Sequence, residues 1–98
     1  MSKFSYLIVD TPNSLHKYLS DIVKGSGVVT FDTEKVGLSI DDKLLGISLY
    51  SEGAIPCFIP TDYYFKGLPI EVIKDIWNEY VPHIKGIAHN AKIGRAHV

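Results

Sequence analysis

The chain is poor in the features that mark secreted, membrane-spanning or strongly charged proteins. Its single cysteine, Cys57, excludes an internal disulfide and fits a reducing compartment. No apolar run approaches the roughly 20 residues that cross a bilayer, and residues 1–4 lack the apolar core of a signal peptide. The net charge of −1 gives no long-range attraction to nucleic acid. We therefore expect a cytoplasmic protein whose contacts with any nucleic acid are local or bridged by cations.

The composition is that of a folded domain. Hydrophobic residues make up 46% of the 98 residues and charged residues 21%, which excludes a disordered chain. At this length the chain holds at most one small domain.

The residue pattern predicts the element order β-α-β-β-β-α-β. Thr11-Pro12 starts a helix with apolar residues at helical spacing, and Gly25 ends it. A second helix is predicted after Pro69. Pro56, inside the fourth predicted strand, indicates an edge position or a bulge. The predicted strands cover residues 6–9, 28–33, 44–50, 54–60 and 85–90. The middle three are close enough for an antiparallel meander, so we expect an α/β fold with a mixed sheet.

An apolar strand leads directly into two acidic residues, Asp32 and Glu34. Side chains alternate along a strand, so both carboxylates point one way and Thr33 points the other. A divalent cation relieves their repulsion, and oxygen ligands suit Mg²⁺ or Mn²⁺. In two-metal hydrolysis, ions about 3.5–4 Å apart activate a water and stabilise the leaving 3′ oxygen. The alternative is an ordinary solvated strand end, because such pairs also arise by chance.

The run Phe31-Asp32-Thr33-Glu34, followed by Gly37-Leu38, resembles the first motif of the DEDD 3′–5′ exonucleases. It looks most like the proofreading domain of family A (DNA polymerase I-like) polymerases. Three further segments agree with that family in order and spacing. They are residues 43–48, residues 54–60, and residues 86–92, which resemble the lead-in to the second motif.

The resemblance implies an RNase H-like fold, a mixed sheet flanked by helices, of which this chain holds an incomplete part. It also implies removal of 3′-terminal nucleotides with two bound Mg²⁺ or Mn²⁺ ions. Asp32 would bridge both metals. Glu34 would bind one metal and help to orient the attacking water.

The resemblance also implies substrate-binding residues. Leu38 matches the position that packs against the terminal base, and a core leucine after a turn is the alternative interpretation. Thr33, His89 and Asn90 would line the substrate cleft. For His89 and Asn90 the alternative is that they are ordinary polar residues at a strand end.

The implied partners are a single-stranded 3′ end of DNA and a C-terminal polymerase domain in the parent protein. The implied location is the cytosol of a bacterium or of a phage-infected host. An RNase D-like RNA exonuclease is the alternative within the class, and residues 45–48 favour the polymerase type. From another class, a non-catalytic domain that binds nucleic acid as a scaffold stays open.

The end of the chain departs from the family. Gly94 stands where the second motif calls for aspartate, and the third motif lies beyond the last residue. Residues 93–98 correspond to the translation of a common sequencing-library adapter, ATC GGA AGA GCA CAC GTC. We therefore interpret residues 1–92 as the N-terminal part of a 3′–5′ exonuclease domain and residues 93–98 as non-native. With half of the metal ligands missing, we expect this 98-residue piece to be inactive.

Overall fold

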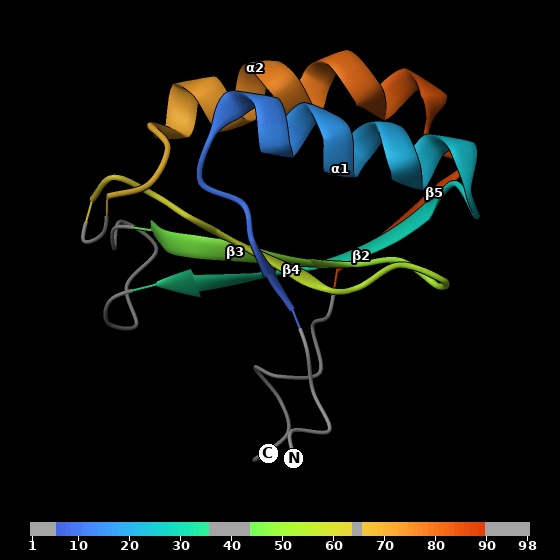
Figure 1. The fold of residues 1–98 in the computed structure, drawn as a ribbon, viewed down its shortest axis with the longest axis horizontal. Coiled ribbons are helices and arrows are strands. Elements are labelled where there is room, and N and C mark those ends of the chain that lie inside the picture. The colour runs from blue at the N-terminus through green and yellow to red at the C-terminus, as the bar shows by residue number, and fades with distance from the viewer. Residues whose placement is uncertain (1–5, 36–43, 64–65, 90–98) are drawn as a thin grey trace.

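Two helices cover one face of a five-stranded sheet in the computed structural model, which describes residues 6–35, 44–63 and 66–89 (Figure 1). The elements are β1 (Leu7–Ile8), α1 (Pro12–Lys24), β2 (Val28–Lys35), β3 (Leu44–Tyr50), β4 (Cys57–Pro60), α2 (Ile70–Tyr80), a 3₁₀ turn (Val81–His83) and β5 (Gly86–His89). This order confirms the predicted α/β class and the predicted sequence of elements.

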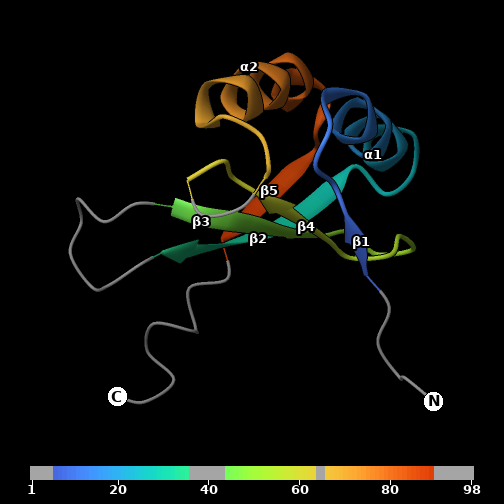
Figure 2. The ribbon, with the colours of Figure 1, turned by 60° about the vertical axis from the view of Figure 1, so that its left-hand side comes forward.

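The strands lie in the order β1-β4-β3-β2-β5. β2, β3 and β4 form the predicted antiparallel meander, while β1 pairs in parallel with β4 and β5 with β2. The connections β1–α1–β2 and β4–α2–β5 each pass two strands in the same direction across the sheet. Crossovers of the same hand then place both helices on one face. The other face carries no helix within the described ranges (Figure 2).

Helix α1 begins and ends where local chemistry predicts. The Thr11 hydroxyl accepts a hydrogen bond from the Ser14 backbone N–H (3.1 Å), and the Ser14 hydroxyl accepts from the Thr11 N–H (3.2 Å), which forms a capping box. At the other end the N–H of Gly25 donates to the carbonyl of Asp21 (2.9 Å). Neither helix in the described part of the chain is long and apolar enough to span a membrane.

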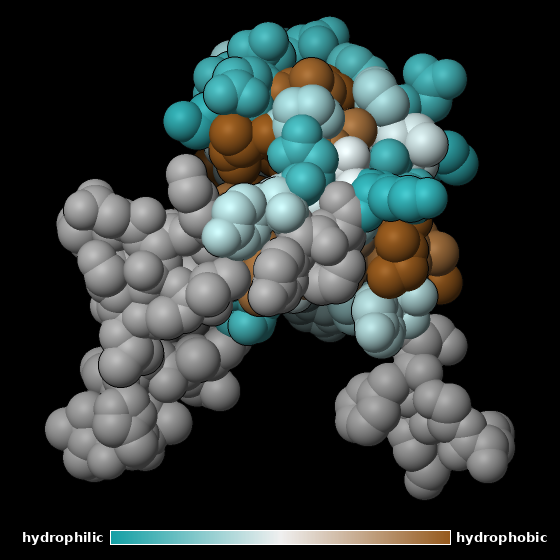
Figure 3. Space-filling model, turned by 90° about the vertical axis from the view of Figure 1, so that its left-hand side faces the viewer, coloured by the Kyte–Doolittle hydropathy of each residue, from teal (hydrophilic) through white to brown (hydrophobic). Residues whose placement is uncertain are grey.

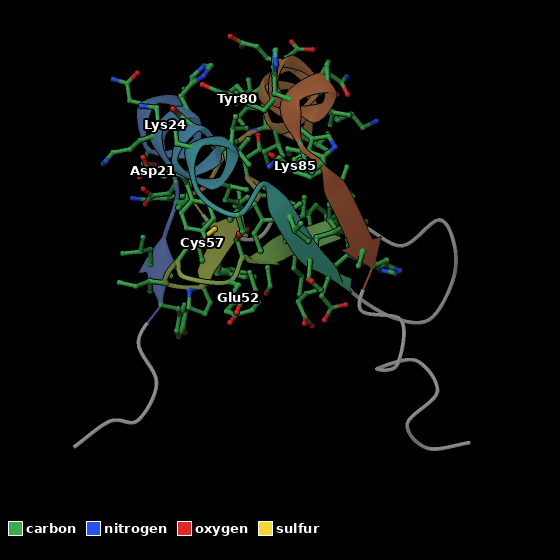
Figure 4. The ribbon with its side chains drawn as sticks, turned by 90° about the vertical axis from the view of Figure 1, so that its right-hand side faces the viewer. Asp21, Lys24, Glu52, Cys57, Tyr80 and Lys85 are labelled. Atoms are coloured by element: carbon green, nitrogen blue, oxygen red, sulfur yellow. The ribbon has the colours of Figure 1, made fainter. Side chains whose placement is uncertain are left out.

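Cys57 belongs to the core between α1 and the sheet (Figure 4). It is 2% exposed, and burial raises the pKa of its thiol to about 12. The neighbouring Tyr18 hydroxyl donates a hydrogen bond to the carbonyl of Ile55 at 2.6 Å, and burial also raises the pKa of Tyr18. The thiol therefore stays protonated near neutral pH and acts as a small apolar core group.

The prediction that Pro56 marks an edge strand or a bulge is wrong. β4 lies between β1 and β3 in the sheet and pairs with both. Pro56 precedes the first residue of β4 and contributes only its carbonyl, which accepts from the N–H of Leu7 at 2.9 Å. The missing N–H of proline therefore costs no ladder hydrogen bond at this position.

A glycine is required where the chain after β4 folds back on itself. The N–H of Leu68 donates to the carbonyl of Pro60 at 2.9 Å, which holds Gly67 against the backbone. A Cβ at Gly67 would lie 2.8 Å from the carbonyl oxygen of Thr61 and closer still to that of Pro60. Since these atoms belong to the backbone, no side-chain rotation can relieve the clash.

We expect Gly67→Ala to lower the free energy of unfolding by about 2–3 kcal/mol, measured by urea denaturation. Gly86→Ala is the matched control, because a Cβ there meets only the Val28 side chain, at an ordinary 3.6 Å. Its expected change is below about 1 kcal/mol. Equal losses in the two variants would contradict this explanation of Gly67.

Candidate metal centre on the uncovered face of the sheet

Asp32 and Glu34 lie in β2, the strand between β3 and β5. The intervening Thr33 lines a cleft beneath α2, as does Phe31, so these two side chains lie on the helix-covered face. Alternation along the strand then places Asp32 and Glu34 together on the opposite, uncovered face. Two residues of extended chain separate their Cα atoms by about 6.6 Å.

The two carboxylates differ in exposure, and neither has a partner among the described residues. Asp32 is half-buried and Glu34 is exposed. Neither side chain makes a hydrogen bond or an ion pair with another residue that the structure describes. Within the described part of the chain they therefore form a pair of like charges without an ion-pair partner, and a bound cation would relieve their repulsion.

The strand is irregular beside the pair. The pairing register of β2 with β3 shifts between Glu34 and Lys35. Such bulges bend a strand and re-aim side chains, and they are over-represented next to active sites. The irregularity lies at the end of β2 that carries the carboxylates.

Polar and aromatic residues of neighbouring strands surround the carboxylates. Ser48 of β3 is paired with Asp32 across the ladder, and Tyr50 of the same strand, 48% exposed, lies on the same face. A Cβ at Gly46, which is paired with Glu34, would collide with the ring of Phe58, so this ring lies beside the glycine. Sequence reasoning missed Ser48, Tyr50 and Phe58 as neighbours, because strand register brings them there. The sequence shows only that Ser48 and Tyr50 are two residues apart in one predicted strand and therefore share a face.

The donor chemistry fits Mg²⁺ or Mn²⁺ in part. Both are hard cations that take carboxylate oxygens, and Mg²⁺ often keeps several waters while bound by one or two carboxylates plus substrate phosphates. Asp32 and Glu34 match that description. No group of three or more His, Cys, Asp or Glu residues gathers within the described ranges, so that part of the chain supplies two protein ligands.

Two of the remaining predicted site residues, Thr33 and His89, lie on the other face of the sheet. Thr33 points to the helix side, where it lines the cleft. His89 of β5 is paired with Phe31, and their ring centroids are 4.8 Å apart. Because paired residues share a face, His89 is on the side opposite the carboxylates. Leu38 and Asn90 lie outside the described residues, as does the 93–98 segment with Gly94.

A scan against models of protein families and a search of curated proteins found no match for this chain. The site is therefore interpreted from its own geometry and chemistry.

We expect Asp32→Asn and Glu34→Gln to change the free energy of unfolding by no more than about 0.5 kcal/mol, or to raise it. Each substitution removes like-charge repulsion and breaks no interaction with the described residues. Ser51→Ala is the control for a polar residue with a structural role. Ser51 is 1% exposed and donates to the carbonyl of Val28 at 2.6 Å, so its loss should cost about 1–2 kcal/mol. A loss above about 1 kcal/mol in Asp32→Asn would show that Asp32 has a structural role instead.

Proposed function

We propose that the chain is part of a metal-dependent 3′–5′ exonuclease domain with an RNase H-like fold, which removes nucleotides from the 3′ end of DNA. The observation that carries the proposal is the pairing of Asp32 and Glu34 on the uncovered face of a central strand. The proposal includes the role that the resemblance implies, proofreading beside a polymerase domain of the same longer protein.

The arrangement of the strands supports this proposal. The described parts of the four segments that resemble the exonuclease family include residues of β2, β3, β4 and β5, which are neighbours in the sheet in the order β4-β3-β2-β5. β5 runs parallel to β2, and His89 at its end is level with Phe31. The C-terminal end of β5 therefore lies beside β2, one residue before Asp32.

The residues present have separate tasks in the proposed site. Asp32 and Glu34 would hold Mg²⁺ or Mn²⁺. When bound, these ions supply an activated water and stabilise the charge that develops on the leaving 3′ oxygen. The half-buried position of Asp32 limits its motion, while the exposed Glu34 can reach toward a water. Tyr50, 48% exposed on the same face, offers a ring on which a base can stack.

Metal binding can be tested on the 98-residue chain by adding Mn²⁺ and following the broadening of backbone amide signals by NMR. We expect the strongest broadening at Asp32, Glu34 and the facing Ser48. The double variant Asp32→Asn/Glu34→Gln should abolish it. Glu71→Gln/Asp75→Asn is the matched control, because both residues are exposed acids of α2. Broadening that follows the α2 pair, or that survives in the Asp32/Glu34 variant, would refute the metal site.

Catalysis requires the ligands that the family carries after residue 92, so the source DNA should be resequenced across that codon. We expect a frame that continues through an aromatic residue and an aspartate. Its product should release 3′ nucleotides from single-stranded DNA with Mg²⁺ and lose at least about 100-fold in rate on Asp32→Ala. The 98-residue chain itself should show no release. A confirmed Gly94 followed by a stop codon would overturn the catalytic proposal, and faster release from RNA would reassign the substrate.

A further inference from the structure

A cleft of about 410 Å³ lies between α2 and the sheet, on the face opposite Asp32 and Glu34. We infer that this cleft binds a free aliphatic carboxylate from solution, with the hydrocarbon chain inside and the carboxylate at the rim beside Lys74 and Asn78. Because the cleft and the carboxylate pair are on opposite faces, a ligand in the cleft would not contact the proposed metal centre.

The cleft exists because α2 packs against α1 more closely than against the strands below it. His16 Nδ1 of α1 lies 3.1 Å from the hydroxyl of Tyr80, and Ile76 of α2 is buried in the core. Beneath α2, by contrast, Phe31 and Ile47 remain partly exposed, and Ile87 is 44% exposed. Figure 3 shows apolar side chains reaching the surface below the helices at this end of the molecule.

The lining of the cleft selects an apolar ligand. Among the described residues, aliphatic side chains from α1, α2 and the strands form most of it, together with the aromatic rings of Phe31 and Trp77. The volume is within the range of small-molecule pockets, roughly 300–1,000 Å³. An aliphatic chain entering this space removes apolar surface of both molecules from water, which is favourable. A sugar-phosphate would find few hydrogen-bond partners there.

The rim of the cleft selects the charge of the ligand. Lys74 is the only charged residue among those of the described part that line the cleft, and it forms no ion pair with a described residue. Asn78 lines the same cleft and follows Lys74 by one turn of α2, so the two side chains are neighbours on the helix surface. An ammonium group and an amide N–H₂ side by side can both donate to one carboxylate.

The chain carries its own reporter for this binding. Trp77 is the only tryptophan and lines the cleft, so its fluorescence senses an occupant. We expect decanoate to change the Trp77 emission saturably. Decanol should bind more weakly because it carries no charge, and decyltrimethylammonium should not bind because Lys74 would repel its cationic head group. Vesicles of phosphatidylglycerol should leave the emission unchanged, since the proposed ligand is a free molecule.

Two variants test the two parts of the cleft. Lys74→Gln should weaken decanoate binding about fivefold and leave decanol binding unchanged. Lys24→Gln, which removes the same charge from an exposed position of α1, should have no effect. Ile87→Phe adds volume at a part-exposed lining position and should reduce binding of both ligands, with urea denaturation confirming that the variant still folds.

Several outcomes would overturn the inference. No emission change with decanoate would show that the cleft does not bind it. Equal binding of decanoate and decyltrimethylammonium, or insensitivity to Lys74→Gln, would remove the role of the rim. A shift that depends on protein concentration alone, with dimers in sedimentation experiments, would identify a second copy of the chain as the occupant. A shift with vesicles but not with free decanoate would identify a lipid surface.

Discussion

The direction in which the chain crosses its sheet constrains the rest of the structure. Both β-α-β connections run the same way, so both helices lie on one face and the other stays uncovered within the described residues. One face of the sheet can therefore bury apolar side chains under helices. The other can keep carboxylates in water, where they avoid the large desolvation penalty of a buried charge.

Strand β2 shows the consequence at the level of single residues. Phe31 and Thr33 point toward the helices and line the cleft below α2, while Asp32 and Glu34 point the other way. A shift of one residue in the strand register would exchange the two sets and bury both carboxylates. The pairing of Asp32 with Ser48 and of Phe31 with Leu49 prevents that exchange. The proposed metal centre and the proposed ligand cleft are thus two faces of one strand.

Local patterns predicted the helices and most strands well. The capping box at Thr11 and the stop at Gly25 are short-range features, and α1 occupies Pro12–Lys24 as they indicate. β3 has the predicted bounds, Leu44–Tyr50. The interpretation of Pro56 failed, because whether a proline harms a strand depends on which neighbour needs its N–H. That neighbour is determined by pairing between distant segments.

By itself, the sequence determined the carboxylate pair, since alternation along a strand requires no information from elsewhere in the chain. It also determined the α/β element order through apolar spacing and turn residues. Only the tertiary structure decided that Ser48, Tyr50 and Phe58 surround the pair and that His89 does not. It also decided that a cleft opens beneath α2. These features depend on strand register and on the hand of the crossovers, which bring together residues with no local signal of their contact.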